Sequence, residues 1–207
     1  MSDYLTLRKE ANDEFIEKRS RFIGYAKPVT TQEEAMDFIN QIRAKHWDAT
    51  HNVYAYVLRE GQARRYSDDG EPSGTAGVPV LDVLLKENIT DCVVVATRYF
   101  GGVMLGAGGL VRAYSHTSKI AVDAAGIMKM SVCSVMSVTC DYNFYGRLTS
   151  LIPEFGGITE DTEFGENVTV KFYLPKANEG LFDAKLVDSS LGKFSAVKIC
   201  EKYAEIE

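Results

Sequence analysis

The residues with the clearest chemical potential lie in a glycine-rich loop that follows the apolar run at 92–99. Five glycines occur in this loop: Gly101, Gly102, Gly106, Gly108 and Gly109. Backbone N–H groups in glycine turns and at a helix N-terminus form concave anion sites, because these donors have no partner within the helix. Arg98 precedes the loop and Arg112 follows it. Cations at a helix N-terminus are unfavourable because the helix dipole is positive there, and an anion between the two arginines would offset this repulsion. The pattern therefore predicts an anion-binding surface.

The helix expected directly after this loop carries polar residues along one side. At helical spacing these are Arg112, Ser115, His116, Lys119 and Asp123. The opposite side is mainly apolar and consists of Leu110, Val111, Ala113, Tyr114, Ala121 and Ala124. Two interpretations are open: a solvated face of an amphipathic helix, or a functional surface that extends from the loop and includes His116 and Lys119.

A second glycine-rich loop spans residues 68–77. Its candidate functional residues are Asp68, Asp69, Glu71, Ser73, Gly74 and Thr75. Carboxylates of this kind bind a divalent cation that carries a phosphate, but Asp-Gly is also a strong turn signal. Neither loop has the GxSxG, phosphate-loop or dinucleotide-binding spacing, and no nucleophile with a matching base can be assembled. The sequence therefore identifies no catalytic residue, and we expect no cofactor and no bound metal.

The strands and helices that must position these loops follow from the apolar patterns. In the first part of the chain, the patterns predict strands at 4–7, 15–26, 51–58, 63–67 and 92–99. They predict helices at 31–44 and 80–85, and a third from the glycine loop to about residue 125. Lys18, Arg19 and Arg21 fall within the second predicted strand, and we interpret them as a solvated sheet edge.

A new unit is expected from residue 130 onward. The patterns predict a strand at 131–141, a helix that Asp141 caps and Pro153 ends, and a strand that starts at 156–159. A strand at 168–174, a helix at 177–190 and a strand at 194–199 follow. This β-α-β-β-α-β order is the ferredoxin-like plan. We therefore expect an α+β protein with domains at 1–128 and 129–207.

Composition limits the classes of partner and compartment. The net charge of −6 argues against a protein that coats nucleic acid by bulk electrostatics. Residues 1–130 carry 16 Lys+Arg against 17 Asp+Glu, whereas residues 131–207 carry 7 against 12, so any polyanion site is a local patch in the first part. No apolar run approaches the ~20 residues that span a bilayer, and charges at Asp3 and Arg8 do not fit a signal peptide. We expect a cytoplasmic protein.

The cysteines and histidines do not have the spacing of a metal site. The cysteines are Cys92, Cys133, Cys140 and Cys200, and the histidines are His46, His51 and His116. The sequence has no CxxC pair, so we expect four reduced, buried thiols that behave as small apolar groups. His51 begins a predicted strand, and we interpret it as structural.

Three segments together resemble the YigZ/IMPACT family: Asp68–Gly77, Val95–Gly106 and Gly108–Tyr114. The resemblance implies that residues 1–128 adopt the β-α-β fold shared by a small-subunit ribosomal protein, GHMP kinases and the fourth domain of elongation factor G. It also implies a ferredoxin-like second domain, as in bacterial members and the fifth domain of that factor. The phosphate-binding motif of GHMP kinases is absent, so kinase activity is not implied.

Eukaryotic members of this family regulate translation through partners that modulate an initiation-factor kinase, using an additional N-terminal domain. The resemblance therefore implies a translation-related regulatory or binding protein that contacts RNA, the ribosome or a translation factor through the glycine and arginine surface. An alternative is an enzyme that acts on a phosphorylated metabolite or nucleotide with a divalent metal on the acidic loop. A third is a protein-interaction module whose glycines only permit close packing, which predicts intolerance of bulky residues at Gly101 or Gly102.

Overall fold

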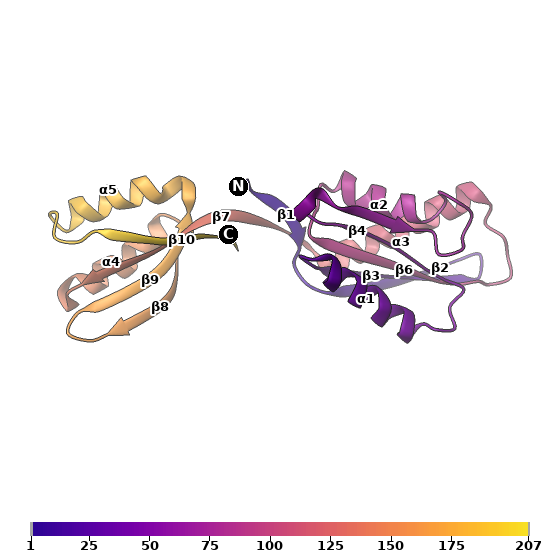
Figure 1. The fold of residues 1–207 in the computed structure, drawn as a ribbon, viewed down its shortest axis with the longest axis horizontal. Helices are drawn as coiled ribbons and strands as arrows, with labels where there is room; N and C mark the ends of the chain where they lie inside the picture. Colours follow the sequence, from indigo (N-terminus) through magenta and orange to yellow (C-terminus); the bar gives the residue numbers. More distant parts are fainter. Residues whose placement is uncertain (1, 207) are drawn as a thin grey trace. The chain divides into compact units, whose positions relative to one another are not determined.

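The computed structural model describes residues 2–206, which divide into two compact units (Figure 1). The N-terminal unit comprises Tyr4–Met128. The C-terminal unit begins at Lys129 and also includes Asp3. Within the described residues, no helix is both long and apolar enough to cross a membrane.

The N-terminal unit is built on one sheet of five antiparallel strands with the order β2-β3-β6-β4-β5. Its elements are β1 (Tyr4–Leu7), β2 (Ala11–Glu17), β3 (Ser20–Pro28), α1 (Gln32–Lys45), β4 (His51–Val57), η1 (Glu60–Gln62), β5 (Arg64–Ser67), α2 (Gly77–Lys86), β6 (Cys92–Tyr99) and α3 (Ala107–Ala125).

One strand prediction is wrong in this unit. The single strand expected at 15–26 is a hairpin of β2 and β3, and Lys18 and Arg19 form its turn. Both residues have positive φ angles, 46° and 68°, which a strand does not allow. The other predicted strands and helices of this unit are confirmed within a few residues at their ends.

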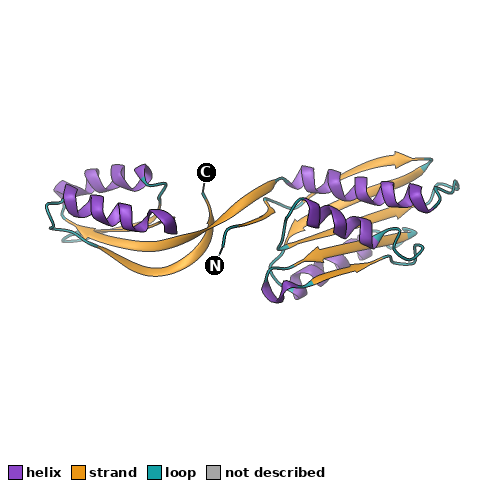
Figure 2. Ribbon diagram, turned by 90° about the horizontal axis from the view of Figure 1, so that it is seen from above, coloured by secondary structure: helices purple, strands orange, loops and turns teal. Residues whose placement is uncertain are grey.

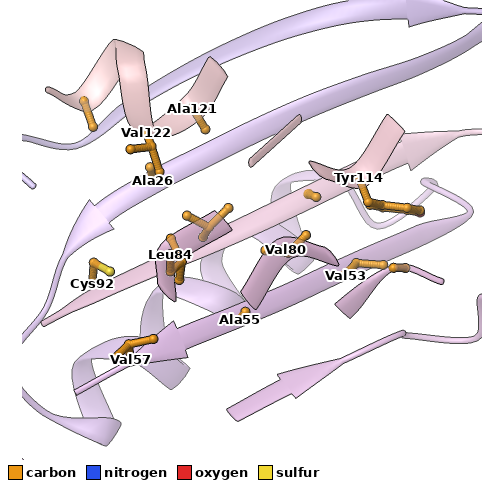
Figure 3. Close-up of a cluster of buried hydrophobic side chains, with 14 of the residues drawn as sticks. Ala26, Val53, Ala55, Val57, Val80, Leu84, Cys92, Tyr114, Ala121 and Val122 are labelled. Atoms are coloured by element: carbon orange, nitrogen blue, oxygen red, sulfur yellow. The ribbon is translucent and has the colours of Figure 1, made fainter. Parts of the chain in front are cut away.

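Helices cover both faces of this sheet, with α2 and α3 on one face and α1 on the other (Figure 2). Strand β6 is central, so its residues face a core on both sides. Cys92 (Figure 3), Val94 and Ala96 belong to the core beneath α2 and α3, and Val93 and Val95 belong to the core beneath α1. This explains why its sequence is a continuous apolar run rather than an alternation.

The C-terminal unit has the predicted β-α-β-β-α-β order, which confirms the ferredoxin-like plan. Its elements are β7 (Ile127–Cys140), α4 (Tyr142–Glu154), β8 (Ile158–Phe164), β9 (Val168–Pro175), η2 (Lys176–Asn178), α5 (Glu179–Ser189) and β10 (Ala196–Glu205). The strands pair in the order β10-β7-β9-β8, all antiparallel. Pro153 lies inside the last turn of α4, and β10 extends six residues beyond the predicted end at 199.

The prediction of four buried thiols is wrong for one cysteine. Cys92, Cys133 and Cys140 are buried, and burial raises the pKa of the Cys92 thiol to about 12. Cys200 is exposed; it lies in β10 opposite Val135 of β7, directly after a register shift between Lys198 and Cys200.

Candidate functional site

The two glycine-rich loops converge at one end of the central strands. Sheet register places Arg98 of β6 opposite Phe22 of β3 and opposite His51 of β4. The loop before α2 and the loop before α3 meet beside this position and enclose a pocket of about 380 Å³. We call it the Arg98 pocket; its lining residues are Thr50, His51, Glu71, Pro72, Arg98, Phe100, Met104, Leu105, Gly106, Ala107 and Leu110.

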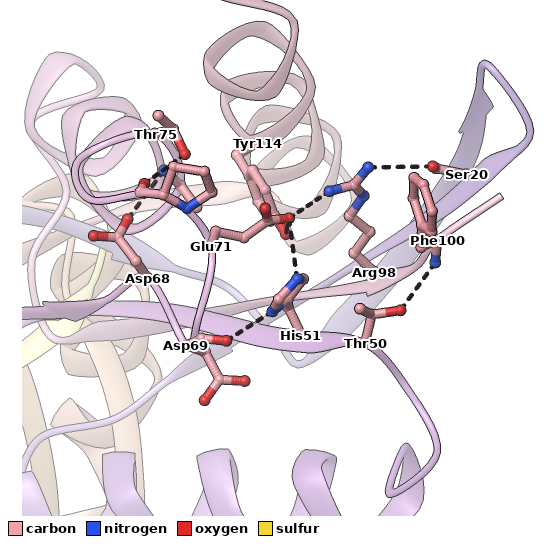
Figure 4. A network of polar contacts seen from close by, with 12 residues as sticks. Ser20, Thr50, His51, Asp68, Asp69, Glu71, Thr75, Arg98, Phe100 and Tyr114 are labelled. Carbon is pink, nitrogen blue, oxygen red and sulfur yellow. Dashed lines mark hydrogen bonds and ion pairs between the residues drawn. The ribbon is translucent and has the colours of Figure 1, made fainter. Parts of the chain in front are cut away.

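A buried polar network forms the base of the Arg98 pocket (Figure 4). Arg98 Nη1 donates to Glu71 Oε1 at 2.6 Å, and the Tyr114 hydroxyl donates to the same oxygen at 2.7 Å. His51 Nε2 lies 3.8 Å from this oxygen. Burial, and then the Glu71 carboxylate, raise the pKa of Tyr114, so its hydroxyl stays protonated and remains a donor. The charges of Arg98 and Glu71 therefore compensate each other inside the protein.

The structure corrects the expectation that Arg98 is available at the surface together with Arg112. Arg98 is only 5% exposed, whereas Arg112 is exposed. The guanidinium carbon of Arg98 lies 5.4 Å from the ring centre of Phe22 and 5.3 Å from that of Phe100. Its Nη2 donates to Ser20 Oγ at 3.4 Å, and its Nε has no hydrogen-bond partner among residues 2–206. Arg98 therefore faces a ligand only within the pocket that it lines, and not on the open surface beside Arg112.

The carboxylates of the acidic loop are engaged by protein donors. Asp68 accepts hydrogen bonds from the backbone N–H groups of Gly74, Ala76 and Gly77, and so fixes the start of α2. Asp69 accepts from the Asn52 N–H at 2.6 Å and pairs with Arg43 at 2.8 Å. These contacts favour the turn interpretation over the metal interpretation. In the part of the chain that the structure describes, no cluster of His, Cys, Asp or Glu has the arrangement of a metal site.

The remaining residues of this loop have local roles. Thr75 Oγ1 donates to the Pro72 carbonyl at 2.7 Å, and Gly74 has a φ of +76° that favours glycine. Ser73 is exposed. Glu71 alone among the predicted residues of this loop points into the Arg98 pocket as part of its polar base (Figure 4).

The glycines before α3 serve two different needs. A Cβ at Gly101 would lie 2.0 Å from the Arg19 carbonyl oxygen, so Gly101 lets the β2–β3 turn lie against the loop. Gly102 and Gly106 have φ angles of +80° and +73°. Gly106 precedes α3 and provides no side chain to cap it, so no side chain accepts from the first N–H groups of α3, where Ala107 and Gly108 are exposed residues.

Exposed cations gather beside this first turn. A second pocket, of about 220 Å³, is lined by Phe15, Glu17, Lys18, Leu105, Gly109, Arg112, Ala113 and His116. Lys18, Arg19 and Arg112 are exposed, and none of them forms an ion pair with a described residue. We call these three residues, together with the first turn of α3, the basic surface.

Two other predicted residues of the α3 stripe have partners of their own. Lys119 pairs with Glu87 at 2.9 Å and with Asp123 at 2.7 Å, and these carboxylates raise its pKa. The His116 ring packs edge-on against Phe15, with ring centres 4.6 Å apart. Lys119 therefore belongs to a solvated face with balanced charge, and His116 lies at the border of the basic surface.

Sequence reasoning did not assign His51, Tyr114, Lys18 or Arg19 to the site. His51 was expected to be structural and Tyr114 to be a core residue, but both contact Glu71. Lys18 and Arg19 were placed on a strand. The hairpin that brings Lys18 and Arg19 to the site has a signal in the sequence. Residues 11–17 differ from residues 20–28 in charge and in apolar pattern, which indicates two strands rather than one.

Known protein families match both units of the chain. The family model of the Impact N-terminal domain matches residues 18–122, and that of a domain of unknown function, DUF1949, matches residues 138–193. The chain is 36% identical to IMPACT family member YvyE of Bacillus subtilis (strain 168), over 93% of this chain and 89% of that protein. It is 33% identical to IMPACT family member YigZ of Escherichia coli (strain K12), over 89% and 92% respectively.

A solved structure, described as the crystal structure of an hypothetical protein, covers 98% of this chain and 100% of that chain, with 31% identity and a TM-score of 0.61. Eukaryotic proteins named IMPACT are also similar, over 44–58% of this chain. The Impact N-terminal match contains both glycine loops, the Glu71–Arg98 pair and the basic surface. The chain therefore belongs to the IMPACT family.

Proposed function

We propose that this protein is a translation-related binding protein that contacts the phosphates of RNA, free or within the ribosome, through the basic surface. The observation that carries the proposal is the first turn of α3, which has no side-chain cap and lies beside three exposed cations without ion-pair partners among the described residues. Membership of the IMPACT family supports a regulatory role, which the eukaryotic relatives suggest at the level of the family.

Physical chemistry favours an anionic partner for this surface. Exposed N–H groups at a helix N-terminus attract anions, and the cation of Arg112 opposes the helix dipole unless a negative group neutralises it. Glu17 also lines the adjoining pocket, which limits the surface to a few phosphate contacts. This agrees with the net charge of −6, which excludes strong non-specific attraction.

The salt dependence of RNA binding tests this proposal. We would measure binding of a structured RNA hairpin and of purified ribosomes between about 50 and about 200 mM salt. Arg112→Ala and Lys18→Ala should each weaken binding and reduce the slope of log K against log salt by about 0.7–0.9. Lys119→Ala is the matched control, because Lys119 is already paired with two carboxylates, and it should bind like the wild type. Absence of binding, or binding that does not depend on salt, would refute the proposal.

A further inference from the structure

We propose that the Arg98 pocket binds one unpaired nucleobase. The base belongs either to an RNA strand that crosses the basic surface or to a free nucleotide. If the base belongs to RNA, this proposal rests on the proposed function; if it belongs to a free nucleotide, it does not. The pocket and the basic surface adjoin each other, because Leu105 lines both the Arg98 pocket and the pocket beside Arg112.

The walls of the pocket suit a flat apolar group. Pro72, Leu105 and Leu110 contribute apolar surface, and the volume of about 380 Å³ lies within the range of small-molecule sites. Phe100 is 48% exposed and Met104 is 85% exposed at the rim. Both side chains line the pocket, and aromatic side chains are the common stacking platforms for unpaired bases.

The base of the pocket is polar, which distinguishes a nucleobase from an apolar side chain of a protein. Arg98 is 95% buried, and its Nε lacks a partner among the residues described. His51 Nδ1 lies 2.8 Å from the Asp69 carbonyl oxygen, which can only accept, so Nδ1 carries a proton and Nε2 is the ring nitrogen left to pair with a ligand. The edge of a nucleobase carries donors and acceptors in one plane and can pair with such groups. A leucine or phenylalanine from a protein partner would remove water from Nε2 of His51 without offering it a hydrogen-bond partner, at a cost in free energy.

The position of α3 supplies a place for the phosphate of the same nucleotide. Gly106 and Ala107 line the pocket and begin α3, whose N-terminal N–H groups have no side-chain cap. A nucleotide with its base against Phe100 therefore has its phosphate on the side where the helix dipole is positive. Inorganic phosphate alone lacks the base and should bind much more weakly.

The first experiment uses free nucleotides. AMP, GMP, CMP and UMP, with inorganic phosphate as the reference, are titrated into the ¹⁵N-labelled full chain while amide chemical shifts are followed. We expect shifts in residues 71–72, 98–107 and 110 for at least one nucleotide at concentrations where phosphate has no effect. Phe100→Ala and Met104→Ala should each reduce the affinity, Phe100→Ala by about tenfold. Met104→Ala keeps the test valid if Phe100→Ala lowers the melting temperature, because the Met104 side chain is exposed.

The second experiment uses RNA. A single strand, its matched duplex and the same strand with one abasic position are compared over a series of salt concentrations. If RNA supplies the base, Phe100→Ala should weaken single-strand binding about tenfold without changing the salt slope, whereas Arg112→Ala should change the slope. If nucleotides bind in a Phe100-dependent manner but RNA does not bind, the pocket proposal holds and the proposed function fails.

Two results would overturn the pocket proposal. One is that no nucleotide exceeds inorganic phosphate while RNA affinity is unaffected by Phe100→Ala, which leaves the phosphate-contact function intact. The other is that a phenylalanine-containing peptide produces the shifts around Phe100 and no nucleotide does, which would assign the pocket to a protein partner.

Discussion

The Arg98 side chain lies among groups from two strands and two loops. Glu71 accepts its hydrogen bond at 2.6 Å, Ser20 receives a second one, and the rings of Phe22 and Phe100 flank its guanidinium. A buried pair of this kind stabilises little when it is compared with an apolar pair, but the loss of one partner leaves the other charge buried and uncompensated. The pair therefore holds the acidic loop against strand β6 at the pocket.

We predict that Arg98→Ala lowers the free energy of unfolding by about 3–5 kcal/mol. The reason is that Glu71, which is also buried, loses its cationic partner. Urea unfolding measures the effect, and Arg112→Ala, at an exposed position without an ion pair among residues 2–206, should change stability by less than about 0.5 kcal/mol. Equal effects of the two substitutions would contradict the buried pairing.

His46 is part of a chain of hydrogen bonds that requires a neutral ring. The Tyr99 hydroxyl donates to Asp48 at 3.0 Å, so its oxygen accepts from His46 Nδ1 at 2.9 Å. His46 Nε2 is then the acceptor for the Tyr25 hydroxyl at 2.7 Å. Burial, and then the charges of Lys45 and Arg21, lower the pKa of His46 below its ordinary value of 6.5.

We predict that the N-terminal unit loses stability as the pH falls below about 6.5. Below this pH, His46 binds a proton in the unfolded chain but not in the folded chain, because its pKa is lower in the folded chain. The free energy of unfolding is therefore highest above about pH 6.5 and decreases as the pH falls toward the folded-state pKa. Urea midpoints between about pH 8 and pH 5 measure the effect. His46→Gln should flatten the curve over this range, whereas His116→Gln at an exposed position should not; an unchanged slope in His46→Gln would disprove the assignment.

At the scale of elements, the turn between β2 and β3 and the loop before α3 depend on each other. Gly101 N–H donates to Ser20 Oγ at 3.2 Å, and the missing side chain of Gly101 leaves room for the Arg19 carbonyl. This contact places the cations of the turn next to the N-terminus of α3. The glycine density of the loop thus has a packing cause at Gly101 and a backbone cause at Gly102 and Gly106.

We predict that Gly101→Ala destabilises the protein by about 1–3 kcal/mol, because the new methyl group overlaps backbone atoms of Arg19. Thermal unfolding measures the loss. Gly146→Ala is the control, since Gly146 lies within α4 with open space around its Cβ position, and it should raise stability by about 0.5–1 kcal/mol. A neutral Gly101→Ala variant would mean that the turn does not lie against the loop.

At the scale of the whole molecule, each unit has its own hydrophobic core. The cores of the N-terminal unit lie on the two faces of its sheet, and the core of the C-terminal unit lies between its sheet and helices α4 and α5. Phe182 is central to the latter, with its ring centre 5.0 Å from that of Phe172 and 5.8 Å from that of Phe155.

We predict that Phe182→Ala destabilises the C-terminal unit by about 3–5 kcal/mol through the cavity that it creates. Amide hydrogen exchange resolves the effect by segment. Exchange should accelerate in β9, α4 and α5 and stay unchanged in β3, β4 and β6, because no residue of the N-terminal cores belongs to the cluster around Phe182. Equal acceleration in both units would show that they unfold as one.

The sequence by itself determined the elements whose signals are local. The continuous apolar run predicted β6 as a central strand, Gly106 and Gly126 mark the ends of α3, and the order of patterns after residue 130 predicted the ferredoxin-like unit. Helix α1 begins with the capping box of Thr31 and Glu34, which two residues three positions apart can form without help from the rest of the chain. Short-range spacing is sufficient in each case.

Only the tertiary structure decided the roles of the charged residues. Glu71 and Arg98 are 27 positions apart, and their pairing depends on the register of β4 with β6 and on the path of the acidic loop. Lys18 lies beside the same pocket as Arg112 because the turn between β2 and β3 packs against Gly101. A charge is exposed, paired or free according to what surrounds it in space, and long-range packing determines those surroundings.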